Sequence, residues 1–202
     1  MQQKIYAGID TSSTNDWASL ALLFPPSPED KNRRHRVEFQ FWVPEQALQQ
    51  KSIDLAIGDQ FIVTPGEVID HQQICATLRH IASKYPISAI GFDRWDSTVT
   101  LATAHAAGIE IRAFGMGYDD MFAPTMRMRL LKESGMLATE NPVFDWMLGN
   151  LRYMQHADGR IKPDVGKSLG SVSGVLSLIL AFAAMVKHET SPRLATAVTS
   201  IV

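Results

Sequence analysis

The chain has 202 residues, of which 46% are hydrophobic and 20% charged, and its formal net charge is -2. This length suits one domain with a sizeable core, and the near-neutral charge excludes a strongly basic nucleic-acid binder of the histone type. The single cysteine, Cys75, excludes a disulfide framework and fits a reducing compartment. The most apolar late stretch, 171–186, is shorter than the roughly 20 residues that a membrane span needs, so a buried helix is predicted there.

Hydrophobic patterning predicts three early strands and then an alternation of strands and helices. Strands are expected at 4–10, 17–24, 37–43, 87–92 and 109–114, with short extended segments at 61–69 and 151–155. Helices are expected within 44–60 and at 70–85, 98–107, 121–134, 142–149 and 174–187, and Asp70 is a candidate N-cap. This order predicts one α/β domain over residues 1–187, a mixed sheet with helices on its faces. Residues 188–202 are predicted to be a C-terminal tail, of a kind that is often disordered.

Two of the predicted strands end in an acid. Asp10 closes YAGID, and Asp93 closes AIGFD. In α/β sheets, sites form at the carboxyl ends of strands, so neighbouring strands would bring the two carboxylates together. Like charges repel unless a cation lies between them, and hard oxygen ligands favour Mg²⁺ or Mn²⁺. The alternative is that each Asp only starts a turn, which is common after strands. Asp16 and Asp96 lie nearby and are interpreted as turn residues or supporting acids.

Six segments occur in an order that resembles one known family. They are GIDTSSTNDWASL, FWVPEQAL, FIVTPGEVIDHQQI, YPISAIGFDRWDS, LLKESGMLATENPVFDWMLGN and DGRIKPDVGKS. Together they are similar to the C-terminal nuclease domain of the tailed-phage terminase large subunit, from about Ile5 to Met185. The resemblance implies a ribonuclease H-like fold, a central mixed β-sheet flanked by α-helices. It also implies a divalent-metal-dependent endodeoxyribonuclease, encoded by a phage or prophage and acting in the bacterial host cytoplasm.

The family also implies partners. Its members cut concatemeric double-stranded DNA during genome packaging, together with a small terminase subunit, a portal and an ATPase domain of the same protein. No G-x-x-x-x-G-K-[ST] phosphate loop occurs in this chain, so we expect an excised domain or a truncated copy. No membrane partner is expected.

The resemblance places the family's first metal-binding acid on Asp10 and its second on Asp93. A two-metal site with Mg²⁺ or Mn²⁺ is implied, in which Asp10 bridges both ions and Asp93 binds one of them. The third acid, at the start of the last helix, is replaced here by Ser173. A serine hydroxyl is a weaker ligand for a hard cation than a carboxylate, so activity is expected to be reduced unless another acid substitutes. The candidate substitutes are Asp16, Asp96 and Asp164.

Other residues near these motifs remain open to two interpretations. Arg94 is a candidate DNA contact or a structural residue, and Lys167 is a candidate phosphate contact or a solvated loop residue. Trp95 and Trp146 are predicted to pack in the core rather than to stack on bases. Three alternative functions also remain. GIDTSST resembles the phosphate hairpin of sugar kinases and actin-like ATPases, which need a second domain. A Holliday-junction resolvase shares the fold and the acidic residues but lacks ENPVFDWMLGN. A DNA-binding or motor-docking module with an incomplete metal site is favoured by Ser173.

Overall fold

The computed structural model describes residues 4–11, 16–27, 29–50, 61–95 and 98–190. Within these residues one mixed sheet forms the centre of the fold. Its strand order is β4 (Phe61–Thr64), β3 (His35–Pro44), β2 (Ala18–Phe24), β1 (Ile5–Asp10), β5 (Ile87–Asp93) and β6 (Glu110–Phe114), and β7 (Leu137–Ala138) also pairs with β3. β1, β2 and β3 are antiparallel neighbours, whereas β5 and β6 run parallel to β1.

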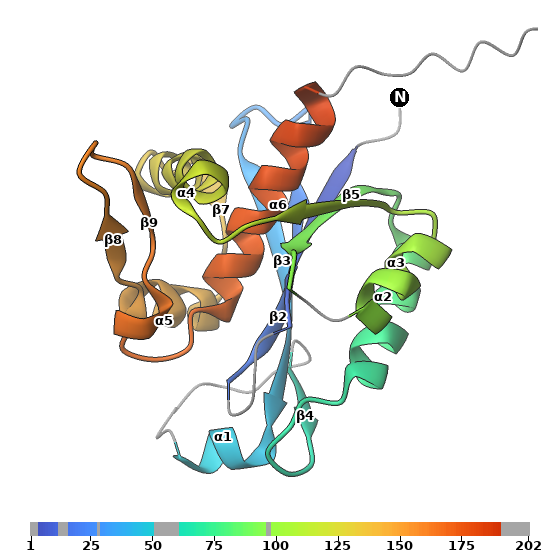
Figure 1. Ribbon diagram of the computed structural model, residues 1–202. Coiled ribbons are helices and arrows are strands. Elements are labelled where there is room, and N and C mark those ends of the chain that lie inside the picture. The colour runs from blue at the N-terminus through green and yellow to red at the C-terminus, as the bar shows by residue number, and fades with distance from the viewer. Residues whose placement is uncertain (1–3, 12–15, 28, 51–60, 96–97, 191–202) are drawn as a thin grey trace, which may run out of the picture.

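Helices cover both faces of this sheet (Figure 1). One face carries α4 (Tyr118–Glu133), α5 (Pro142–Asn150) and α6 (Ser173–Thr190), and the other carries α2 (His71–Lys84) and α3 (Thr98–Ala106). Smaller elements complete the fold: α1 (Glu45–Gln50), the hairpin strands β8 (Tyr153–Gln155) and β9 (Ile161–Pro163), and a 3₁₀ turn at Val165–Lys167. The α/β class and the mixed, helix-flanked sheet predicted from the sequence are confirmed.

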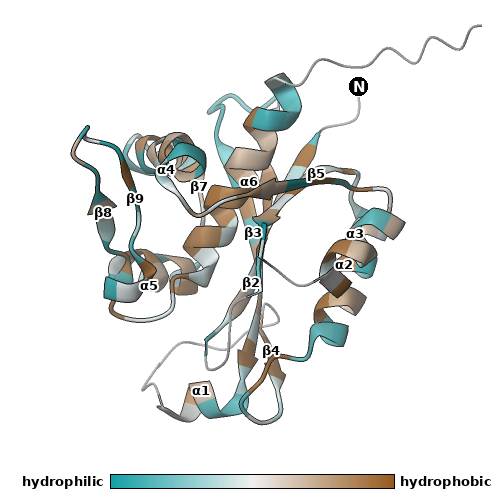
Figure 2. Cartoon of the chain, viewed as in Figure 1, coloured by the Kyte–Doolittle hydropathy of each residue, from teal (hydrophilic) through white to brown (hydrophobic). Residues whose placement is uncertain are grey.

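The alternation of side chains along β1 divides the core into two layers. Ile5, Ala7 and Ile9 pack toward α2, whereas Tyr6 belongs to the cluster beneath α6. Figure 2 shows hydrophobic residues along the central strands and α6 and hydrophilic ones toward the outer ends of the helices. Every residue of α6 from Ser173 to Met185 is buried, which explains its apolar sequence. No helix in the described part of the chain is long and apolar enough to cross a bilayer.

Two glycines allow α6 to lie directly on the sheet. A Cβ atom on Gly8 would overlap the backbone of Ser177 and Ala181, and one on Gly91 would overlap the carbonyl oxygen of Leu180. Gly8 and Gly91 are in-register neighbours on β1 and β5. The helix is therefore fixed against the two strands that end in acids.

Most of the predicted elements lie where the patterning placed them. Asp70 is the N-cap of α2, since its side chain accepts the N–H of Gln72 at 2.8 Å. β7, β9 and the 3₁₀ turn were not predicted, because two or three residues are too few to show a period. α6 continues to Thr190, and the rest of the predicted tail lies outside the described residues.

His35 gives the fold a pH dependence. Its side chain is 7% exposed at the start of β3, and burial, with a smaller contribution from the charge of Arg127, lowers its pKa from 6.5 to about 4. Between these values the unfolded chain binds the proton and the folded chain does not, so stability falls as the pH drops from 6.5 toward 4. We expect this residue to account for about 3 kcal/mol of that fall.

The measurement is urea unfolding at several pH values between 4 and 7. His35→Gln should show a shallower decline in this window than the wild type, whereas the exposed His105→Gln should follow the wild type. Equal slopes for wild type and His35→Gln would contradict the assignment.

Candidate active site at the carboxylate edge

Asp10 and Asp93 end neighbouring strands. β1 and β5 are parallel, and Ile9 lies beside Phe92 in their register. The next residue of each strand is its last, and in both it is the acid. We call this edge of the sheet the carboxylate edge, defined by Asp10 and Asp93.

Both acids project from the face of the sheet that α6 covers. Gly8 and Gly91 contact the backbone of α6, and side chains two residues apart on a strand share a face. Each acid follows its glycine by two residues, and each is partly exposed. The Oδ1 of Asp93 accepts the N–H of Trp95 at 3.3 Å. Two carboxylates thus lie on adjacent strand ends where a cation can reach them from solvent.

A buried chain of hydroxyl groups connects Ser173 to the strand position beside Asp10. Asp10 is the cross-strand partner of Ser19. The Oγ of Ser19 is 2.9 Å from the Oγ of Ser173 and 2.9 Å from the Oγ of Ser177, which in turn donates to the carbonyl of Gly174 at 3.1 Å. The first residue of α6 therefore reaches the strand position next to Asp10, with a hydroxyl in place of a carboxylate.

Three further acids were candidates to complete the site. Asp16 precedes β2, and its Oδ1 accepts the N–H of Trp17 at 2.8 Å. Asp164 is 7% exposed and caps the 3₁₀ turn by accepting the N–H of Lys167 at 3.2 Å. Asp96 lies outside the described residues. Among the residues described, no three His, Cys, Asp or Glu side chains gather where they could hold a metal ion. Asp16 and Asp164 thus form no group of three with Asp10 and Asp93 among the described residues, and a supporting role for either acid stays a prediction.

The two candidate DNA-contacting cations differ in their surroundings. The Nη2 of Arg94 lies 3.0 Å from Asp120 Oδ2, and Asp120 also accepts the N–H of Gly115 at 2.6 Å. Arg94 thus ties the turn after β5 to the start of α4, while its side chain stays 52% exposed, so a DNA contact by Arg94 remains a prediction. The Nζ of Lys167 is 3.8 Å from Asp164, and its side chain is 79% exposed. Lys167 is therefore accessible to a phosphate.

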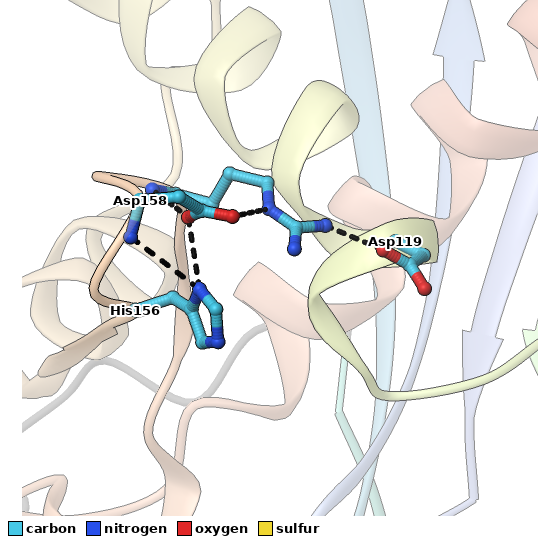
Figure 3. A network of polar contacts seen from close by, with 4 residues as sticks. Asp119, His156 and Asp158 are labelled. Carbon is cyan, nitrogen blue, oxygen red and sulfur yellow. Dashed lines mark hydrogen bonds and ion pairs between the residues drawn. The ribbon is translucent and has the colours of Figure 1, made fainter.

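The β8–β9 hairpin is anchored to the same end of α4. Figure 3 shows the network that anchors it. On the hairpin, Asp158 contacts His156 and the guanidinium of Arg160, and this guanidinium also pairs with Asp119 at the start of α4. Hydrogen bonds from the backbone and side chain of Arg160 hold the pKa of the Asp158 carboxyl down, at about 2. Lys162 also donates to the Met116 carbonyl at 2.8 Å. Residues 115–120 therefore connect the hairpin to the turn that follows Asp93.

The two tryptophans predicted to pack in the core have different environments. Trp146 meets the prediction, because its ring lies 5.6 Å from that of the fully buried Trp17. The prediction for Trp95 is wrong, since this residue is 86% exposed. The apolar residue type suggested burial, but Trp95 lies in a turn beyond the end of β5, where its side chain is exposed.

Comparison with known proteins identifies the fold. No protein-family model and no curated protein match the chain. Among solved structures, the HK97 bacteriophage large terminase aligns with 24% identity and a TM-score of 0.76, over 91% of this chain and 40% of that one. The large terminase nuclease from thermophilic phage G20c aligns with 17% identity and a TM-score of 0.57, over 90% of this chain and 82% of that one.

A third structure, the large terminase nuclease domain of Thermus phage P74-26, aligns with 18% identity and a TM-score of 0.53, over 89% of this chain and 78% of that one. The G20c nuclease has also been solved with bound magnesium, and that structure aligns with 16% identity and a TM-score of 0.57. This chain thus spans less than half of the HK97 protein but most of the isolated nucleases. It has the ribonuclease H-like fold, in the arrangement found in the nucleases of phage large terminases.

Proposed function

We propose that the chain is the nuclease domain of a phage terminase large subunit and cleaves DNA with a divalent cation. The observation that carries the proposal is the carboxylate edge, where Asp10 and Asp93 end adjacent parallel strands on the α6 face. The G20c terminase nuclease, which shares this fold, has been solved with bound magnesium and with bound cobalt. These observations support metal-dependent phosphodiester hydrolysis as the reaction.

The residues present fit one hard divalent cation. Mg²⁺ is commonly held by one or two carboxylates, with water and substrate phosphate as its remaining ligands. Asp10 and Asp93 would hold it, and their negative charges would repel each other without it. When bound, such a cation lowers the pKa of water for attack on the phosphodiester and neutralises phosphate charge. A second ion, as in a two-metal site, would meet the Ser173 hydroxyl where the family has a carboxylate.

The biological substrate that we propose is concatemeric phage DNA, cut to genome lengths during packaging. Nothing in the sequence matches a motif that reads bases in a groove, so non-specific phosphate contacts would supply most of the affinity. Lys167, whose side chain is 79% exposed, is the more exposed of the two candidate cations for such a contact. The choice of cutting site would come from the small subunit, the portal and the ATPase domain.

The test is nicking of supercoiled plasmid with Mn²⁺, with Mg²⁺ and with a chelator. The proposal expects nicking with the cations and none with the chelator. A folded chain that shows no metal-dependent nicking, in any of these conditions, would contradict it.

Ser173 favours a second candidate function, a DNA-binding or motor-docking module with weakened cleavage. The two functions are separated by the variant Ser173→Asp, which places a third carboxylate next to the strand position of Asp10. We expect nicking and Mn²⁺ affinity to rise by about tenfold or more, because an anionic oxygen ligand replaces a neutral one. In chelator the same variant should unfold at a lower temperature, because a carboxylate buried at a 1% exposed position lacks a counter-ion.

The measurement is thermal unfolding against Mn²⁺ concentration, together with the nicking rate. Ser173→Asn is the control for size, because it adds a neutral side chain at the same place. If Ser173→Asp behaves like Ser173→Asn in both assays, another group already fills the ligand position.

A further inference from the structure

Trp95 differs from the other tryptophans of the chain in its exposure. Trp17 and Trp42 are 0% exposed, and Trp146 packs against Trp17, whereas Trp95 is 86% exposed. An indole buries a large apolar surface when it finds a partner, and proteins that bind unpaired nucleic acid stack its bases on aromatic side chains of this kind. The described residues supply no such partner within the fold for the Trp95 ring.

The turn that carries Trp95 is fixed beside the carboxylate edge. The Trp95 N–H donates to Asp93 Oδ1 at 3.3 Å, and the Arg94 N–H donates to the Phe114 carbonyl at 2.9 Å. The Arg94 side chain adds its ion pair with Asp120 on α4. The turn is thus held to β6 and α4 through Arg94, and the Trp95 backbone, two residues beyond Asp93, is held to Asp93 itself.

We infer that Trp95 stacks on an unpaired base of the DNA strand whose phosphate lies at Asp10 and Asp93. This inference rests on the proposed function. An indole presents two flat faces, and a nucleobase offers a matching face regardless of its identity. In a fully paired duplex, neighbouring bases cover those faces. Trp95 therefore selects DNA that is locally unpaired near the cut, without selecting its base sequence.

The experiment uses Asp10→Asn protein in chelator, so that DNA is bound without being cut. Fluorescence anisotropy compares two labelled DNAs of one sequence, a fully paired duplex and a duplex with a short unpaired bubble. The variants Trp95→Ala, Trp95→Leu and Trp95→Phe are added to this background. Leu130→Ala, which trims an apolar side chain 58% exposed on α4, is the matched control.

Trp95→Ala and Trp95→Leu should each weaken bubble binding by about tenfold and change duplex binding far less. Trp95→Phe, which keeps an aromatic face, and Leu130→Ala should bind the bubble like their parent. Iodide should quench the emission of Trp95 in the free protein, and bubble DNA should protect it. Thermal unfolding of each variant checks that the fold is kept.

Two results would overturn the inference while leaving the proposed function intact. One is bubble binding by Trp95→Ala equal to that of the parent, and the other is equal binding by Trp95→Leu and Trp95→Phe, which would indicate an apolar contact without stacking. If the parent binds neither DNA and the wild type does not nick plasmid, the inference fails together with the proposed function.

Discussion

Asp10→Asn is expected to reduce metal-dependent nicking by roughly 1000-fold or more, since charge stabilisation at the reacting phosphate is among the largest catalytic contributions. Asn keeps the size of the side chain but removes the charge that would hold the cation. Asp93→Asn should behave in the same way, because Asp93 ends the adjacent strand on the same face. The measurement is the rate of plasmid nicking with Mn²⁺ in excess.

A second readout separates loss of the cation from loss of the fold. Ligands that bind only the folded state raise the unfolding temperature, so Mn²⁺ should stabilise the wild type but neither variant. Asp70→Asn is the control for the same chemical change. Asp70 caps α2 on the opposite face, and Asn is an equally good N-cap, so nicking and stability should both be kept. Nicking by Asp10→Asn at the wild-type rate would remove Asp10 from the active site.

Gly91→Ala and Gly8→Ala are each expected to destabilise the fold by about 3 kcal/mol or more. The added Cβ would overlap the backbone of α6, which cannot rotate away as a flexible side chain could. To accommodate the methyl group, α6 must move off the sheet, which opens the core under β1 and β5. The measurement is urea unfolding, followed by circular dichroism.

Gly149→Ala is the matched control for these variants. Gly149 lies in α5, and a Cβ there would meet nothing within 4 Å. Because Ala favours a helix more than Gly does, this variant should be neutral or more stable by up to about 1 kcal/mol. If Gly8→Ala and Gly91→Ala unfold at the same urea concentration as Gly149→Ala, α6 does not contact the strands as closely as described.

The sequence was sufficient to predict the elements that build the carboxylate edge. The run before Asp10 carries no charged residue, the run before Asp93 is apolar except for Ser88, and each stops at an acid, so both strands and their ends could be recognised. That β1 and β5 are neighbours could not be derived from patterning, because β2, β3 and β4 lie between them in the chain and extend the sheet from the other edge of β1. The family resemblance, rather than the periodicity, indicated that the two acids meet.

Features that depend on distant pairs were missed. Ser19 and Ser173 are 154 residues apart, and no local pattern indicates that their hydroxyls share a hydrogen bond. Trp95 was misassigned because residue type favoured burial, although its place directly after DR, beyond the strand end, was a signal for exposure. Asp16 and Asp164 could be excluded from a three-acid cluster only in three dimensions.

The direction of α6 determines where a label can be attached without blocking the carboxylate edge. The helix starts with Ser173 at the carboxylate edge. Near its other end, Glu189 accepts a hydrogen bond from Tyr6 and His188 contacts Glu110. Tyr6 and Glu110 lie at the N-terminal ends of β1 and β6. Its 18 residues span roughly 27 Å. A fluorophore or affinity tag joined after Thr190 would therefore leave from the pole of the molecule opposite Asp10 and Asp93, so a chain immobilised by that end would keep its carboxylates open to DNA in solution.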